Sequence, residues 1–245
     1  MAKITLLAEH NCVASAIAGS VDALTIANLW WQFMKNDGAG PLFETQIVTL
    51  DGKPVIANGG TILTPSRSVH EAERSDLILL PAFFPPFDKQ NKRIKAICQW
   101  VRKSYQSGIE IACTCTGTFL LAETGLLNGK TATTNWLFAD SFKREYPKVN
   151  LRIERILTED DGLYCTGAAT SFMSLCLHLI EKYGSQDLAS RCAKALLVDT
   201  DRHIQSPYAI HDFRKNHADN QVLKAQQWME KKYESKFSMD EVAAS

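Results

Sequence analysis

The residue with the clearest chemical potential is Cys115. It follows the short apolar run 109–113 and precedes Thr116 and Gly117, small residues that are typical of a helix start. A buried strand that turns directly into a helix presents its corner residue above the sheet, as in a nucleophile elbow. Backbone N–H groups and the positive end of the helix dipole would surround the sulfur and favour the thiolate. The pattern predicts a pocket-lining cysteine that could act as a nucleophile.

A cysteine nucleophile needs a base, and His10 is the candidate. It follows the first predicted strand, on the side expected to face Cys115, although a loop histidine of this kind is more often simply exposed. His178 lies within an apolar helical run, which predicts a core histidine whose hydrogen bonds are satisfied. Cys113 and Cys115 could place their sulfurs on one face of a strand. Because no second cysteine or histidine pair has ligand spacing, we expect no metal and no cofactor.

Composition narrows the class of protein. The chain has 245 residues, 45% of them hydrophobic and 22% charged, which fits an ordinary globular protein. Its 27 basic and 27 acidic residues balance, so the chain has no electrostatic footprint for nucleic acid or membranes. The sequence shows no signal peptide and no apolar run of membrane-spanning length. Seven cysteines, mostly in apolar segments, favour a reduced, cytoplasmic protein.

Apolar runs and turn residues predict alternating strands and helices. The predicted strands are 3–8, 43–50, 55–57, 61–63, 76–81, 109–113, 149–157 and 163–165. The predicted helices are 21–31, 91–107, 136–146, 171–183 and 186–198, with Ser20 as the N-cap of the first. This alternation implies an α/β, three-layer sandwich with a largely parallel sheet. Ligands of such sheets bind beyond the carboxyl ends of the strands, so the loops after Ala8, Pro81 and Cys113 should meet at one site.

The C-terminal part has a different character. Residues 201–219 are mostly polar and read as a linker, and residues 220–245 as one helix and the start of another. Apolar residues mark one face of the first helix, namely Val222, Ala225, Met229 and Tyr233. Ser238 and Glu241 have the spacing of a capping box. Because so short a stretch cannot bury a core alone, we expect either docking on the main domain or a natural protein that continues past Ser245.

The run from Cys115 to Lys130, followed by 132–136, resembles AraC-family transcriptional regulators with an N-terminal PfpI, or type 1 glutamine-amidotransferase-like, domain. The likeness covers nearly all of residues 1–200 and extends to Gln205-Ser206-Pro207. It implies a flavodoxin-like sensor domain over 1–200 and a linker over 201–219. Residues 220–245 are similar to the first helix, and the start of the second, of an AraC-type helix-turn-helix domain. The recognition helices would lie beyond Ser245.

Three departures from the family pattern concern catalysis. The histidine that polarises the cysteine in related enzymes is replaced by Asn135, which cannot accept a proton near neutral pH. The acidic residue of the first helix is missing from the stretch 14–18. Ala82, Phe83 and Phe84 stand where related enzymes carry glycines, which suggests an apolar pocket wall. Together these departures favour ligand binding over turnover.

The sequence therefore predicts a non-catalytic, dimerising sensor domain of an AraC-type regulator. The effector would be a small metabolite such as an amine, an amide or an amino-acid derivative. The predicted ligand contacts are Cys115, Thr116, Gly117, Asn135, Ala82, Phe83 and His10. DNA would be a partner through the complete helix-turn-helix domain and not through this fragment. Two alternatives remain: a cysteine enzyme (hydratase, amidase or aldehyde-modifying) using Cys115 with His10 or an ordered water, and a module that acts by association alone.

Overall fold

A computed structural model describes residues 1–35, 38–83, 88–209, 219–232 and 235–243. The chain forms two compact units, Met1–Ala209 and Ile210–Ser245. The first unit continues beyond residue 200, where we expected the linker to begin. Phe84 and Tyr233, which the sequence predictions mention, lie outside the described residues.

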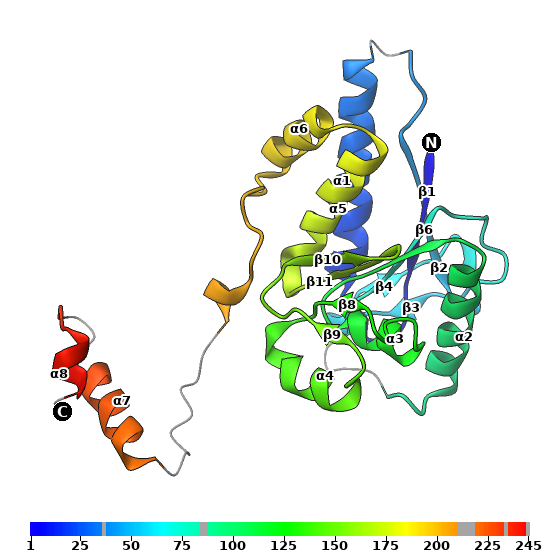
Figure 1. The fold of residues 1–245 in the computed structure, drawn as a ribbon. Helices are drawn as coiled ribbons and strands as arrows, with labels where there is room; N and C mark the ends of the chain where they lie inside the picture. Colours follow the sequence, from blue (N-terminus) through cyan, green and yellow to red (C-terminus); the bar gives the residue numbers. More distant parts are fainter. Residues whose placement is uncertain (36–37, 84–87, 210–218, 233–234, 244–245) are drawn as a thin grey trace. The chain divides into compact units, whose positions relative to one another are not determined.

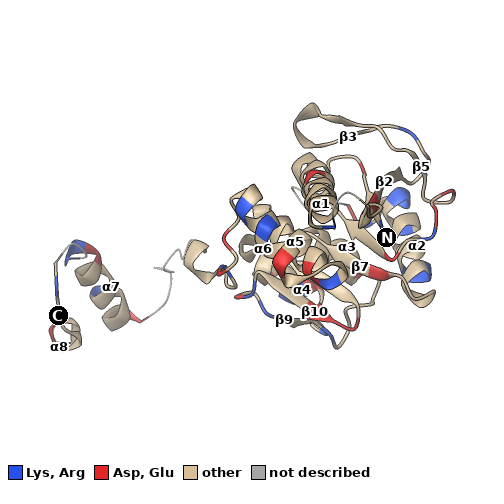
Figure 2. Ribbon diagram, turned by 90° about the horizontal axis from the view of Figure 1, so that it is seen from above, with Lys and Arg blue, Asp and Glu red and all other residues tan. Residues whose placement is uncertain are grey.

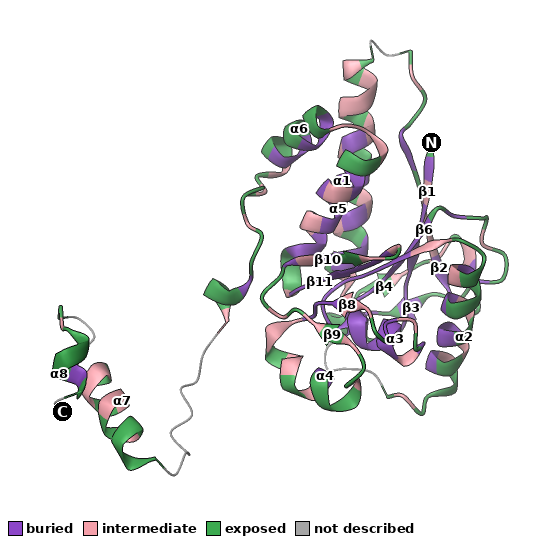
Figure 3. Ribbon diagram, in the orientation of Figure 1, coloured by how far each residue is buried: buried purple, intermediate pink, exposed green. Residues whose placement is uncertain are grey.

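A seven-stranded sheet forms the centre of the first unit. Its strands are β1 (Ala2–Leu7), β2 (Phe43–Thr49), β5 (Arg67–Ser68), β6 (Leu77–Leu80), β7 (Glu110–Cys113), β10 (Leu157–Asp160) and β11 (Leu163–Thr166). Their order across the sheet is β10-β11-β7-β6-β1-β2-β5, and every pair is parallel except β10 and β11. All four residues of β6 are buried, as expected for a central parallel strand with both faces covered (Figure 3).

Helices cover both faces of this sheet (Figure 1). One group, α1 (Ala14–Met34), α5 (Phe172–Tyr183) and α6 (Gln186–Leu196), packs together on one side. On the other side α2 (Lys92–Gln106) and α3 (Gly117–Glu123) contact each other and β7, and α4 (Ala139–Glu145) follows. Two small sheets complete the unit, β3 (Val55–Ile56) with β4 (Ile62–Leu63) and β8 (Thr131–Ala132) with β9 (Asn150–Leu151). The prediction of a three-layer α/β sandwich with a largely parallel sheet is confirmed.

The predicted start of the first helix is wrong. Helix α1 begins at Ala14, and Ser20 lies inside it, where its hydroxyl donates to the carbonyl of Ala16 at 2.6 Å. A serine hydroxyl that donates to the carbonyl four residues earlier belongs to the interior of a helix and does not cap its N-terminus. Gly19 has a packing role instead, because a Cβ there would lie 2.7 Å from the ring of Phe172 in α5. Gly19 thus allows α1 and α5 to approach closely.

The predicted strand 149–157 is also largely wrong. Only β9 and the first residue of β10 fall within it, and a turn closed by Arg155 N–H to Arg152 O (3.1 Å) lies between them. The extended backbone after this turn pairs with a distant segment: Ile156 N–H donates to His203 O at 3.1 Å, and Arg155 bridges Ile204. The backbone of Arg155 and Ile156 therefore pairs with the segment near residue 204 and not with a neighbouring strand.

The second unit contains α7 (Asn220–Lys232) and α8 (Met239–Ala243). The capping box is confirmed, because Glu241 accepts from Ser238 N–H at 2.7 Å and Glu241 N–H donates to Ser238 Oγ at 3.3 Å. Basic and acidic residues are both spread over several helices and loops of the two units (Figure 2). None of the helices in the described ranges is long and apolar enough to span a membrane.

Candidate functional site

Cys115 lies at the corner between β7 and α3 with a left-handed backbone, φ +52°. This conformation costs a non-glycine residue on the order of 1 kcal/mol, so its surroundings must hold it in place. The amide of Cys115 donates to Thr166 O at 3.1 Å. Its carbonyl accepts from Thr118 Oγ1 at 3.0 Å and from Thr134 Oγ1 at 2.9 Å. Hydrogen bonds on both sides thus fix the corner.

The sulfur of Cys115 faces an amide rather than a base. Asn135 Nδ2 donates to Cys115 Sγ at 3.5 Å, while Asn135 Oδ1 accepts from Leu137 N–H at 3.0 Å. The second bond caps the 3₁₀ turn Trp136–Phe138 and so fixes which atom of the amide is directed toward the sulfur. Cys115 is only 7% exposed. The arrangement can hold a thiol, or donate to a ligand that replaces it as acceptor, but Asn135 cannot remove the thiol proton.

Thr116 and Gly117 join the corner to the loop after β6. Thr116 Oγ1 accepts from Phe83 N–H at 2.9 Å and donates back to Phe83 O. Gly117 lies so close to Pro81 that a Cβ would meet the Pro81 carbonyl oxygen at 2.4 Å. Ala82 O accepts from Val13 N–H at 2.8 Å, just before α1. The loops after β1, β6 and β7 therefore do meet at one edge of the sheet.

His10 is oriented toward a different partner. Its side chain is exposed, and its Nδ1 accepts from Ile56 N–H at 3.2 Å. Among the described contacts, no hydrogen bond joins His10 to Cys115. The geometry assigns His10 to holding the β3 segment, and its role as a base stays a prediction.

An ion pair beside this site, between buried Glu9 and partly exposed Arg93, was not anticipated from the sequence. Glu9, 3% exposed, accepts from the guanidinium of Arg93 at 3.0–3.2 Å, and Arg93 also donates to Asp51 at 2.9 Å. The hydrogen bond from Arg93 lowers the pKa of Asp51, and the bond to Glu9 raises the pKa of Arg93. Because Arg93 lies in the first turn of α2, this network ties α2 to the loop after β1. The sequence did contain one signal for this ion pair, because the charged residue Glu9 directly follows the buried run that ends at Ala8.

The other cysteines differ from Cys115. Cys113 Sγ lies 3.4 Å from Thr118 Oγ1, and Cys113 pairs in register with Cys165 of β11. Burial raises the pKa of Cys113 well above its usual range, and raises the pKa of Cys98 to about 11. The sulfurs of Cys113 and Cys115 thus have different neighbours, with Cys113 enclosed in the sheet.

Gln205 is the second feature that was not anticipated. It is 3% exposed, its Oε1 accepts from Ala168 N–H at 3.0 Å, and its Nε2 donates to the carbonyls of Thr134 and Ile153, each at 2.8 Å. Gly167 makes room for it, because a Cβ there would lie 2.4 Å from Oε1. Gln205 therefore anchors the end of the first unit next to Asn135. A buried glutamine within a polar stretch has no local signal, because its partners are far away in sequence.

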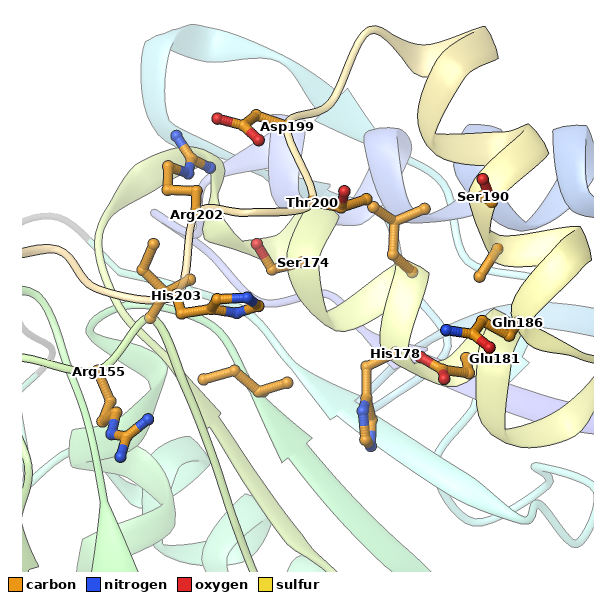
Figure 4. A pocket seen from close by; sticks show the side chains of 14 residues that line it. Arg155, Ser174, His178, Glu181, Gln186, Ser190, Asp199, Thr200, Arg202 and His203 are labelled. Atoms are coloured by element: carbon orange, nitrogen blue, oxygen red, sulfur yellow. The ribbon is translucent and has the colours of Figure 1, made fainter.

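Two cavities lie near this anchor. The smaller, about 170 Å³, is lined by Trp136, residues 168–171, Arg202, Gln205 and Tyr208 among others, and Cys115 is not in its wall. The larger, about 520 Å³, lies between β10, α5, α6 and residues 199–203 (Figure 4). His178 lines the larger cavity, and its buried Nε2 makes no hydrogen bond. The prediction of a core histidine is therefore wrong, because the side chain is 32% exposed, and its Nε2 lies at ion-pair distance, 3.3 Å, from Glu159 Oε2 of β10.

The model of the DJ-1/PfpI family matches residues 27–182. The chain belongs to the DJ-1/PfpI family. It is 30% identical over 158 residues to the HTH-type transcriptional regulator CdhR of Pseudomonas aeruginosa. These residues make up 64% of this chain and 46% of CdhR. It is 23% identical over 243 residues to the HTH-type transcriptional regulator GbdR of the same species, covering 98% of this chain and 63% of GbdR. The chain thus spans roughly half to three fifths of these relatives.

Solved structures with this fold include regulators. A putative transcriptional regulator from Vibrio parahaemolyticus has a TM-score of 0.69 and 23% identity, with 80% of this chain and 98% of that chain covered. An AraC family transcriptional regulator from Pseudomonas putida has a TM-score of 0.66 and 16% identity, with 80% of this chain and 100% of that chain covered. An isonitrile hydratase of Pseudomonas putida is also related, with 24% identity over 152 residues, 61% of this chain and 63% of that enzyme. The proteins to which this chain is similar therefore include both regulators and an enzyme.

Proposed function

We propose that residues 1–209 form the non-catalytic, effector-binding domain of a cytoplasmic AraC-type transcriptional regulator, which binds DNA as a homodimer through a complete helix-turn-helix domain. The observation that carries this proposal is the pair formed by Cys115 and Asn135. An amide N–H directed at the sulfur replaces the base that catalysis requires. The regulators CdhR and GbdR among its relatives support the regulatory part.

The effector would bind beside Asn135, in or next to the 170 Å³ cavity that Trp136 and Gln205 line. Its acceptor would compete with Cys115 Sγ for the amide of Asn135. The carbonyl of an amide or the carboxylate of an amino-acid derivative can supply that acceptor. Any shift of Asn135 reaches Gln205 directly, because the preceding carbonyl, Thr134 O, accepts from Gln205 Nε2. Gln205 is followed after a few residues by the second unit. The anchor would therefore transmit a change at the effector site to the DNA-binding part.

The test uses the full-length regulator and its operator DNA. A panel of small amines, amides and amino acids is screened for a thermal shift, and each ligand found is then titrated against operator binding. We expect an effector to change the Kd for DNA about 10-fold, within the usual range of allosteric coupling. Asn135→Ala should weaken effector binding, whereas Gln99→Ala on the exposed face of α2 should not. A bound ligand that leaves DNA affinity unchanged contradicts sensing.

The enzyme alternative makes an opposite prediction about the thiol. The left-handed Cys115 corner, together with the relationship to isonitrile hydratase, keeps a cysteine enzyme under consideration. Alkylation rate is measured against pH for the wild type, Cys115→Ser and His10→Ala. A low thiolate pKa that rises in His10→Ala would support catalysis. A rate profile that His10→Ala leaves unchanged would support the non-catalytic proposal.

A further inference from the structure

The 520 Å³ cavity differs in its lining from the region around Cys115. Its walls come from β10 with the residues before it, from α5 and α6, and from residues 199–203. Leu177 and Ile156 are buried apolar residues in its lining, whereas most of the rim is polar or charged. None of the predicted ligand contacts, from His10 to Asn135, lines it. It is therefore a candidate site distinct from the elbow, although it shares Ile156 and Arg202 with the 170 Å³ cavity.

Charges of opposite sign lie at opposite ends of this cavity. Figure 4 shows Arg155, Arg202 and His203 on one side and Glu181 with Gln186 on the other, with the guanidinium groups of Arg155 and Arg202 directed away from each other. Within the described parts of the chain, no ion pair involves Arg155, Arg202 or Glu181. Asp199 is drawn beside Arg202, but its Oδ1 accepts from Asp201 N–H at 2.9 Å, and Arg202 lies 5.8 Å from the ring of Tyr208.

Two side chains of the lining carry buried polar atoms without a hydrogen bond. They are Arg202 Nε and His178 Nε2, two of the four such side-chain atoms among the described residues. Buried polar atoms in folded proteins nearly always have a partner, so each exception needs an explanation. Arg202 Nε belongs to the cationic end and His178 lies toward Glu181 (Figure 4). Arg202 Nε therefore has unused hydrogen-bonding capacity, whereas His178 Nε2 already lies 3.3 Å from Glu159 Oε2.

We propose that this cavity binds a small zwitterion. A carboxylate, or a similar anionic group, would accept from the guanidinium of Arg202, whose planar donors suit two acceptor oxygens. Arg155 would add positive charge to the same side of the cavity. An ammonium group would lie at Glu181, and a short apolar spacer would cover Leu177. Such a ligand would bridge residues 199–203 to α5.

Binding at this cavity stands independently of the regulatory function, but its consequence rests on that function. Residues 199–203 lead directly to the Gln205 anchor, so a ligand that holds them in place would stabilise the anchored state of Gln205. The cavity would then act as a second input beside the Asn135 site.

The first test is calorimetry on the chain with glycine, β-alanine, γ-aminobutyrate and ε-aminocaproate, which differ only in the spacing of their charges. Butyrate and butylamine serve as single-charge probes. We expect one of the zwitterions to bind at least about 10-fold more tightly than either single-charge probe, since charge-assisted hydrogen bonds at both ends add to affinity. Equal affinity for the single-charge probes, or no binding of any zwitterion at millimolar concentration, overturns the proposal.

Variants locate the bound zwitterion. Arg202→Gln and Glu181→Gln should each weaken it about 10-fold or more, and Arg155→Gln should weaken it less. Glu181→Gln covers the case in which Arg202→Gln fails to fold. Arg152→Gln is the matched control, because Arg152 is exposed in the same segment and does not line the cavity. Loss of binding in Asn135→Ala, but not in the cavity variants, would place the ligand at the elbow and refute this site. Failure of DNA regulation would leave the binding result unchanged, so the two proposals fail separately.

Discussion

Around Cys115, backbone and side-chain groups are joined by short hydrogen bonds inside the first unit, whereas around Arg202 charged groups face a cavity without ion-pair partners in the described residues. The first region holds a strained backbone, and it needs every one of those bonds. The second keeps its hydrogen-bonding capacity available. The difference indicates that the elbow is a rigid frame with one adjustable contact, Asn135 to Cys115, while the cavity beside residues 199–203 is suited to taking up a ligand. Substitutions should therefore cost stability in the first region and affinity in the second.

Gly117→Ala should have the largest effect on stability. The new Cβ would lie 2.4 Å from the Pro81 carbonyl oxygen, and neither backbone can move without disturbing the corner. We expect a loss of about 3 kcal/mol in the free energy of unfolding, at the upper end of overpacking costs. Urea denaturation measures it, with Gly40→Ala as control because nothing lies within 4 Å of its added Cβ. Equal losses in both variants would show that the corner is not tightly packed.

Gln205→Ala should cost about 2 kcal/mol, since it leaves the partly buried Ala168 N–H and the buried Thr134 carbonyl without their partner. The same denaturation experiment, with Gln99→Ala as the exposed control, gives the value. In addition, limited proteolysis should cut the variant faster near residues 200–209. A variant as stable and as resistant as the control would mean that Gln205 is not the anchor of this segment.

Asp51→Asn tests how the ion pair between Asp51 and Arg93, beside the elbow, changes the free energy of unfolding with pH. Because Arg93 lowers the pKa of Asp51 below its usual 3.8, the carboxylate contributes stability above that value, and this contribution is lost as the pH falls through the lowered pKa. The wild type should therefore be more stable than Asp51→Asn at about pH 6, and the two should converge in acid. Urea midpoints across this range measure the difference, with Asp22→Asn, an exposed carboxylate of α1, as control. A constant difference at all pH values would contradict the Arg93 contact.

Arg155→Gln should have the smallest effect on stability, within about 0.5 kcal/mol, because the side chain is exposed and no ion pair of the described residues involves it. Its effect should appear instead in zwitterion affinity. If this variant unfolds as readily as Gln205→Ala, the contrast between the rigid elbow and the open cavity does not hold.

The sequence was sufficient where local patterns decide structure. Apolar runs located the central strands β1, β6 and β7, and small residues after Cys113 located the corner at Cys115. The capping box at Ser238 and Glu241 was also predictable, because its two members are only three residues apart. In each case the relevant interactions lie within a turn or along one strand, so spacing along the chain contains the information.

Tertiary structure decided the features that depend on distant partners. Gly19 and Ser20 resembled a helix start, but both lie inside α1. The glycine is there because the ring of Phe172 packs against it, a contact with a residue far away in the sequence. Glu9 and Arg93 are 84 positions apart, and Gln205 and Thr134 are 71 apart, so no local pattern links them. The sequence alone determined the fold class and the cysteine corner, because periodicity and turn chemistry are local. Which side chains surround that corner, and where the charged cavity lies, follows only from packing between remote segments.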